Sequence, residues 1–311
     1  MRQWRPYHWA SWLKWQGLLG MYDHGYLGRV PGVESTRLNI ANIAEGFSEN
    51  LLPVVYVGTP GPQQKAVVTL VGAESGSSQA VLKVALGQDA ATSIRREAHV
   101  LSELERQSQL LAPRLLWIDD HGRRSCQSVI LGKLTGRVLT RRHVAWLLHL
   151  PRSGQATTLD AQHEMFIRVF EKNFSEEAAL IEPALAALAG AAPLPLTLVH
   201  GDFAPWNLKW LEHGTIVAID WEEACFGGLP LHDICHFYAM QAHLFGGRGV
   251  LETLDGSFLV REYLQGMGVV QESLRPLFLH YLLTMLAGLG GDCSPAYRRF
   301  LLDQIGEVTR S

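Results

Sequence analysis

A short strand-like island interrupts the second half of the chain, which is otherwise patterned for helices. It reads V-H-G-D-F-A-P-W-N-L-K-W-L-E-H-G-T-I-V-A-I-D-W-E from Val199 to Glu222. Apolar runs at 196–200, 208–211 and 216–220, separated by a loop and a Gly-containing turn, predict strand, loop, strand, turn and strand. Such a hairpin brings the loop and the end of the last strand to one rim. We therefore expect Asp202, Asn207 and Asp220 to lie together.

Two carboxylates and an amide are the set that phosphoryl transfer needs. One carboxylate accepts or orients the proton of an attacking hydroxyl, and the other groups hold Mg²⁺ against the oxygens of a nucleotide. Because Mg²⁺ prefers hard oxygen ligands and keeps several waters, one Asp and one Asn suffice beside the phosphates.

The island resembles the aminoglycoside phosphotransferase and choline kinase group of protein-kinase-like enzymes. His200-Gly201-Asp202 with Asn207 is similar to the family's H-G-D-x-x-x-x-N catalytic loop, and the I-D-W-E at 219–222 to its I-D-[aromatic]-E metal-binding stretch. The resemblance implies that Asp202 is the catalytic base, that Asn207 and Asp220 bind Mg²⁺, and that His200 braces the catalytic loop.

The first half of the chain has the pattern of the small lobe that this family requires. Short runs rich in Val and Leu, split by Gly, Pro and Ser, predict an antiparallel meander. A helix follows with Thr92 or Ser93 as its N-cap, and two more strands come after it. The expected strands are 51–57, 66–71, 80–85, 114–118 and 128–131.

The expected fold is therefore α+β, a protein-kinase-like bilobal fold. It has a small antiparallel-sheet N-lobe with one main helix and a mostly helical C-lobe. Helical periods predict helices at 165–174, 176–188, 257–264 and 277–286, and one starting at Asp233. We divide the chain into a Trp-rich extension (1–48), a nucleotide-binding N-lobe (49–135) and a catalytic and substrate-binding C-lobe (136–311).

Lys83 lies inside an apolar strand, V-L-K-V. An unpaired buried ammonium is costly, so this lysine needs anionic partners. Glu97 in the following helix supplies one and nucleotide phosphates supply the other, which is the lysine–glutamate pair of kinases. Glu103 and Glu105 lie on the same helix as alternatives.

The nucleotide-binding loop is less distinctive. The first turn, with Gly58, Thr59 and Gly61, allows backbone amides to approach phosphate closely. The resemblance places the phosphate cover there, whereas the hydroxyls of Ser75–Ser78 make the next turn a competitor. The adenine is expected to hydrogen-bond to the backbone near Leu131 and Leu134, where the two lobes join.

Only twelve residues separate Asp220 from Asp233, which leaves no room for a long activation loop. A peptide substrate is therefore not expected, and Asp233 is interpreted as a brace for the catalytic loop. After residue 200 the acidic residues outnumber the basic ones by thirteen to seven. That balance, with Glu222 and Glu223 beside the metal and Trp206 and Trp221 available for stacking, would suit a cationic acceptor. The alternative, solvated charges and core aromatics, stays open, as do neutral sugars.

Composition excludes other classes of function. A net charge of −3 without charge runs gives no reason to expect a nucleic acid partner. Four scattered cysteines and no visible signal peptide or membrane-spanning run favour a cytoplasmic protein. The Trp-rich first segment predicts a helix packed on the main body or a contact with a partner or membrane surface. His232, Cys235 and His236 lack zinc-finger spacing and are interpreted as packing residues.

The sequence thus predicts a small-molecule kinase that uses ATP or GTP with Mg²⁺. Its acceptor is a hydroxyl of an aminoglycoside-like compound, an amino alcohol or a sugar. The alternatives are a metabolic kinase for a sugar or glycan precursor, and a nucleotide-binding regulatory or scaffold protein on a kinase fold.

Overall fold

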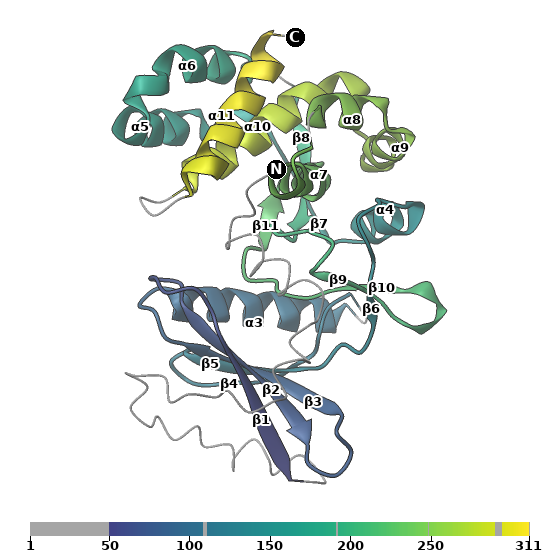
Figure 1. The fold of residues 1–311 in the computed structure, drawn as a ribbon. Helices are drawn as coiled ribbons and strands as arrows, with labels where there is room; N and C mark the ends of the chain where they lie inside the picture. Colours follow the sequence, from purple (N-terminus) through teal and green to yellow (C-terminus); the bar gives the residue numbers. More distant parts are fainter. Residues whose placement is uncertain (1–49, 108–110, 191, 248, 290–293, 311) are drawn as a thin grey trace, which may run out of the picture.

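The chain folds into two lobes, as the kinase-like prediction requires (Figure 1). The computed structural model describes residues 50–107, 111–190, 192–247, 249–289 and 294–310. The predictions for the Trp-rich segment fall outside these ranges. A sheet with one long helix forms the N-terminal lobe, and helices around two small sheets form the C-terminal lobe. The α+β fold class is confirmed.

The N-terminal lobe is a five-stranded antiparallel sheet in the order β1-β2-β3-β5-β4. Alternate residues of β2 are buried, and Val68 and Leu70 join Leu82 and Cys126 in a small core. This is the period-2 pattern of a sheet with one covered face. The strands are β1 (Leu51–Val57), β2 (Lys65–Gly72), β3 (Ser78–Ala85), β4 (Leu115–Ile118) and β5 (Arg124–Ser128).

The last strand of this sheet corrects the prediction of a strand at 128–131. β5 instead covers Arg124–Ser128 and lies between β3 and β4. Its polar residues Ser125 and Gln127 are buried because the strand pairs on both sides. Backbone pairing with β3 and β4, rather than the hydrophobicity of its side chains, makes this segment a strand.

Helix α3 (Ala90–Arg106) connects the two lobes. It begins earlier than predicted, with Asp89 at the N-cap, because the Ser93 hydroxyl donates to Gln63 Oε1 (2.8 Å) instead of capping the helix. Ile94 packs with the N-terminal sheet, whereas Leu101 and Leu104 join the core of the C-terminal lobe. The helix therefore carries its side chains into both lobes.

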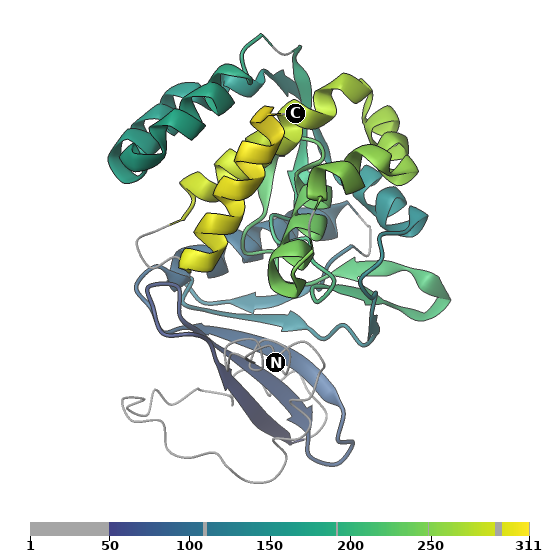
Figure 2. The same ribbon diagram turned by 45° about the horizontal axis from the view of Figure 1, so that its top comes forward.

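The C-terminal lobe surrounds two three-stranded sheets, β10-β9-β6 and β11-β8-β7 (Figure 2). The predicted island is present as β8, β9 and β10. The strands are β6 (Lys133–Leu134), β7 (Arg152–Thr157), β8 (Leu194–Val199), β9 (Leu208–Trp210), β10 (Ile216–Ala218) and β11 (Cys225–Gly228). Since β6 pairs with β9, the chain has already entered the second lobe at Lys133.

The helices of this lobe include the five predicted ones, with shifted ends. The prediction did not include α4, α8 and α11, nor the strands β7 and β11. The helices are α4 (Arg141–Leu148), α5 (His163–Asn173), α6 (Ala178–Ala186), α7 (His232–Phe245), α8 (Val250–Gly256), α9 (Phe258–Met267), α10 (Leu274–Ala287) and α11 (Pro295–Arg310). Among the described helices, none combines the length and apolar character of a membrane span.

Two backbone hydrogen bonds fix the lobes near the predicted site. The amide of Ala218 in β10 donates to the carbonyl of Leu111, just beyond α3 (3.0 Å). The amide of Thr135 donates to the carbonyl of Leu208, which directly follows Asn207 (3.0 Å). The island is therefore tied to the chain just after α3 and to the chain just after β6.

Candidate active site

The loop between β8 and β9 holds the predicted base. Asn207 Nδ2 donates to Asp202 Oδ2 (2.8 Å) and to the Asp202 carbonyl (3.0 Å). His236 of α7 contacts the other carboxylate oxygen, with 2.9 Å between Nε2 and Oδ1. The Asp202 side chain stays about one-third exposed. Each of its oxygens thus has a protein donor while the carboxylate remains open to a substrate.

Asp233 holds the backbone of this loop in place. Its two carboxylate oxygens accept from the backbone amides of His200 (2.8 Å) and Gly201 (3.0 Å), as the sequence predicted for a brace. His200 is fully buried, and its Nε2 donates to the carbonyl of Ile219 (3.1 Å). Burial lowers the pKa of the His200 imidazole. His200 therefore supports the loop and does not face a substrate.

Gly201 allows this loop to pack against the segment after Asp220. Its φ of 81° lies in the left-handed region, and an added Cβ would lie 2.2 Å from the carbonyl oxygen of Glu223. Only glycine meets both conditions.

Lys83 lies between Glu97 and Asp220. Its ammonium is 2.7 Å from Glu97 Oε2 and 2.6 Å from Asp220 Oδ1. Burial by itself would lower the pKa of Lys83, but the two carboxylates raise that pKa well above its ordinary value. Burial likewise opposes ionisation of Asp220, yet Lys83 brings the pKa of Asp220 down to about 2. Both groups are therefore charged at neutral pH.

The residues at this point fit a magnesium ion. Because Asn207 binds Asp202 through its amide nitrogen, its carbonyl oxygen is left for another partner. Lys83 takes one oxygen of Asp220, and the side chain of Asp220 is 39% exposed. One amide oxygen and one carboxylate oxygen are hard ligands of the kind Mg²⁺ takes alongside phosphates.

The turn between β1 and β2 lies at the Lys83 end of the sheet. Lys65 at the start of β2 pairs with Ala85, two residues beyond Lys83, whereas Val71 at the other end pairs with Ser78. The turn is fixed by backbone bonds: Gly87 N donates to Gln64 O (2.8 Å) and Asp89 N to Pro62 O (2.9 Å). This position favours the turn with Gly58, Thr59 and Gly61 over Ser75–Ser78 as the phosphate cover.

The segment that joins the lobes carries the two leucines predicted near the base. Leu131 is 69% and Leu134 is 42% exposed. Leu134 belongs to β6 and pairs with Lys209, and Lys209 Nζ donates to the carbonyl of Ile130 (2.9 Å). The lysine therefore takes one of the backbone acceptors next to Leu131.

The acidic residues after Asp220 contact the N-terminal lobe. Glu222 forms an ion pair with Lys65, and Glu223 lies 3.5 Å from Arg96 NH1. Arg96 also donates to the carbonyl of Glu222 (3.0 Å). Both carboxylates that the sequence analysis considered for a cationic acceptor therefore lie beside cations of the N-terminal lobe.

Trp221 does not reach the surface, so its predicted role in stacking on a substrate is wrong. The ring is completely buried against His200 and Trp146, with centroids 4.6 and 5.8 Å away. Its backbone amide donates to Glu97 Oε1 (3.2 Å). Trp221 thus links the metal-binding stretch to the Lys83–Glu97 pair. Trp206, in the catalytic loop, is partly exposed.

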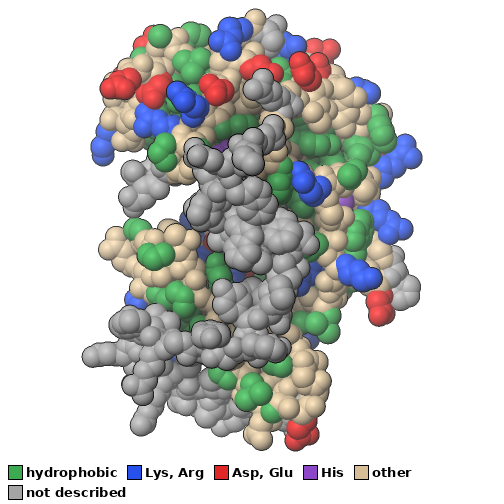
Figure 3. Space-filling model, viewed as in Figure 1, with side chains coloured by type: hydrophobic (Ala, Val, Ile, Leu, Met, Phe, Trp, Pro, Cys, Tyr) green, Lys and Arg blue, Asp and Glu red, His purple; other side chains and the backbone are tan. Residues whose placement is uncertain are grey.

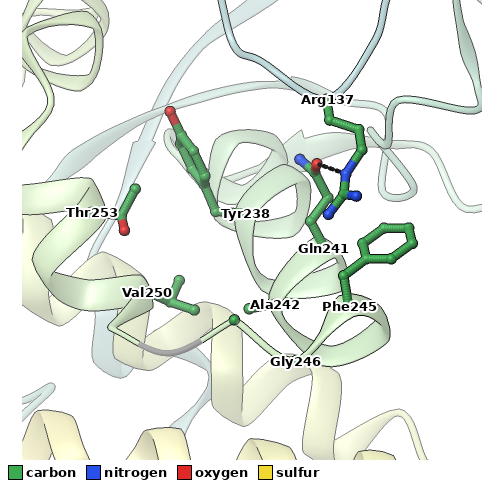
Figure 4. A pocket seen from close by; sticks show the side chains of 9 residues that line it. Arg137, Tyr238, Gln241, Ala242, Phe245, Gly246, Val250 and Thr253 are labelled. Atoms are coloured by element: carbon green, nitrogen blue, oxygen red, sulfur yellow. Dashed lines mark hydrogen bonds between the residues drawn. The ribbon is translucent and has the colours of Figure 1, made fainter.

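A pocket of about 290 Å³ lies between α7, α8 and the chain after β6 (Figure 4). Gln241, Tyr238, Phe245 and Thr253 line it together with Arg137. The Arg137 guanidinium lies over the Phe245 ring, 3.6 Å from its centroid, and Nε donates to Gln241 Oε1 (3.4 Å). Gln241 is five residues beyond His236, about 7.5 Å along the helix axis. The pocket therefore lies further along α7 than His236, the residue that meets the catalytic loop.

Residues 150–272, which contain this loop, match the sequence pattern of the Phosphotransferase enzyme family. This segment is similar to phosphotransferases. The resemblance to the aminoglycoside phosphotransferase and choline kinase group is thereby confirmed. No curated protein matches the chain in sequence.

Solved structures of similar fold come from the same group of enzymes. The GDP complex of wild-type aminoglycoside 2'-phosphotransferase-IIIa has a TM-score of 0.58 at 13% identity, covering 88% of this chain and 99% of that one. Choline kinase LicA from Streptococcus pneumoniae gives 0.58 at 12% identity, with 87% and 97% covered. A putative fructosamine-3-kinase from Thermobifida fusca YX-ER1 gives 0.54 at 20% identity, with 87% and 98% covered. These likenesses concern the fold.

Sequence reasoning missed one residue that touches the predicted base. His236 was assigned to packing, whereas its imidazole contacts Asp202. The signal was its spacing from Asp233: residues three apart on a helix share a face. A residue one turn beyond the brace therefore points toward the same loop.

Proposed function

We propose that the chain transfers the γ-phosphoryl group of ATP or GTP to a hydroxyl of a small molecule, as a cytoplasmic Mg²⁺-dependent kinase. The observation that supports it best is the Lys83 ammonium between Glu97 and Asp220, close to a loop that presents Asp202 and Asn207. Phosphates would take Asp220's place at Lys83, and Asn207 and Asp220 would hold Mg²⁺, which neutralises charge on the phosphates.

Asp202 acts on the acceptor. Its carboxylate receives the proton of the hydroxyl as the hydroxyl oxygen bonds to the γ-phosphorus and the bond from that phosphorus to the bridging oxygen breaks. The nucleoside diphosphate leaves with the bridging oxygen. Lys83 and the turn with Gly58, Thr59 and Gly61 hold the phosphates, and backbone near Leu131 and Leu134 receives the base.

The acceptor that we propose is rich in hydroxyls and neutral or anionic, such as a sugar, rather than polycationic. Glu222 and Glu223 are paired with N-terminal cations. The pocket between α7 and α8 presents a cation instead. In the described part of the chain Arg137 bonds only through Nε, which leaves its terminal nitrogens as donors. Figure 3 shows basic side chains beside α4 and α9, and a mixture of acidic and basic ones on the helices at the top of the lobe.

The test is nucleotide turnover with Mg²⁺ over a panel of sugars, amino alcohols and aminoglycosides, for the wild-type chain and Asp202→Asn. We expect turnover with a sugar-type acceptor and a loss of about 10²–10⁴-fold in kcat for the variant, the usual contribution of a general base. Arg137→Met should raise the acceptor KM and leave nucleotide binding unchanged.

Turnover, and not thermal shift, separates the kinase from the scaffold alternative, because a nucleotide that binds the folded state raises the melting temperature in both cases. Binding without turnover on any acceptor would favour the scaffold, and turnover only with aminoglycosides would overturn the proposed acceptor class. No stabilisation by nucleotide would overturn the kinase proposal itself.

A further inference from the structure

His236 lies on α7 in the C-terminal lobe, and its side chain contacts Asp202, the predicted base. Its side chain is 4% exposed, and Nε2 is 2.9 Å from Asp202 Oδ1. We propose that His236 is a positioning residue that fixes the orientation of the Asp202 carboxylate for proton acceptance. This inference rests on the proposed kinase function.

The two carboxylate oxygens are held from two directions. Asn207 donates to Oδ2 and His236 donates to Oδ1. Since the donors come from different elements, the catalytic loop and α7, rotation of the carboxylate about its last bond would break both hydrogen bonds. A carboxylate oxygen has two lone-pair positions, so each oxygen can still face an acceptor hydroxyl. His236 thus fixes the angle of the base without occupying it.

A second contact lies at the other ring nitrogen of His236. The hydroxyl of Tyr281 lies 3.3 Å from Nδ1. A carboxylate oxygen accepts hydrogen bonds and does not donate them, so the contact with Asp202 requires the imidazole hydrogen on Nε2. In the neutral ring Nδ1 is then an acceptor, and the buried Tyr281 hydroxyl can donate to it.

The packing around α7 keeps this arrangement in place. The backbone of α7 is anchored by Asp233, one turn earlier, through its two hydrogen bonds to the catalytic loop. The His236 ring also packs edge-on against Tyr281, with centroids 6.1 Å apart. The loop and the positioning residue therefore move as one unit, since both are attached to the start of the same helix.

The experiment compares kcat, nucleotide KM and melting temperature for the wild-type chain, His236→Phe and His236→Gln. Phenylalanine fills the space without a donor, and we expect kcat to fall about 10- to 100-fold, because small misplacements of a reacting group cost about that much. Nucleotide KM should stay within about twofold. Glutamine can donate from its amide, so it should recover most of the lost kcat.

His280→Gln is the matched control, because His280 is also a buried histidine but hydrogen-bonds Thr284 and not Asp202. It should lower the melting temperature and leave kcat unchanged. Wild-type kcat in His236→Phe would overturn the inference. The inference would also be overturned if His236→Phe and His236→Gln lost kcat equally and in proportion to their fall in melting temperature. Absence of any turnover by the wild-type chain would instead count against the proposed function.

Discussion

At the scale of single residues, the site depends on one buried cation and its two acids. Lys83 and Glu97 have 6% and 2% of their side chains exposed, whereas Asp220 is 39% exposed. Asp220 can therefore be hydrated when Lys83 is removed, but Glu97 cannot. Removing one partner of a buried pair leaves a charge without compensation, and this costs more than the pair itself contributes.

Lys83→Met should therefore destabilise the fold by about 3–5 kcal/mol and abolish nucleotide binding. Urea unfolding gives the first quantity and isothermal titration with nucleotide and Mg²⁺ the second. The double variant Lys83→Met/Glu97→Gln is the control. It should recover much of the stability and none of the binding. Recovery of nucleotide affinity in the double variant would contradict a role for Lys83 at the phosphates.

At the scale of elements, the catalytic loop and the stretch after Asp220 pack without a side chain between them at Gly201. Gly201→Ala would place a methyl group against the Glu223 carbonyl in a left-handed backbone conformation. The strain of such a conformation costs about 1–3 kcal/mol. The loop should shift, and we expect kcat to fall at least tenfold. Gly154→Ala, a left-handed glycine with open space around it, is the control for strain alone and should leave kcat unchanged.

The ion pairs that join the lobes differ in burial, and so should their effects. The side chains of Lys65 and Glu222 are 12% and 23% exposed, whereas those of Arg96 and Glu223 are 44% and 58% exposed. Exposed pairs contribute about 0–1 kcal/mol. Lys65→Ala should therefore lower kcat/KM for nucleotide about tenfold by loosening the lobes, and Arg96→Ala by about twofold or less. Steady-state kinetics at low and high salt check both.

At the scale of the whole molecule, buried histidines make the fold sensitive to acid. Burial lowers the pKa of His143 and His280 to about 4 and that of His232 to about 3, from an ordinary 6.5. Below pH 6.5 the unfolded chain binds protons that the folded chain does not. The free energy of unfolding therefore decreases as the pH is lowered. Asp233, whose pKa burial raises, acts in the opposite direction at lower pH.

We expect the free energy of unfolding to be greatest above pH 6.5 and to fall steeply toward pH 4. Each of His143 and His280 accounts for about 3 kcal/mol of the loss, a large part of an ordinary total of about 5–15 kcal/mol. Urea unfolding at pH 7.5, 6.0 and 5.0 measures this. His143→Gln should flatten the dependence. A free energy of unfolding that stays constant from pH 7.5 to 5.0 would contradict the assignment.

The sequence by itself predicted the phosphoryl-transfer chemistry and determined the fold class. Asp202, Asn207 and Asp220 lie within nineteen consecutive residues, and a hairpin with strong local patterning brings them together whatever surrounds it. Lys83 was predictable because an apolar strand cannot bury an ammonium without a partner. The strands β1, β2 and β3 were predictable from their apolar runs and from the turn residues between them, because these signals are local too.

Only the tertiary structure decided what lies against these residues. Lys65 meets Glu222 across 157 positions, and His236 meets Asp202 across 34. The ring of Trp221 is covered by α4, far from it in the sequence. Contacts of this kind depend on how helices and lobes pack, and no local pattern encodes packing between distant segments. The sequence therefore predicted the reaction, and the packing determined which side chains contact Asp202 and which residues of the two lobes meet.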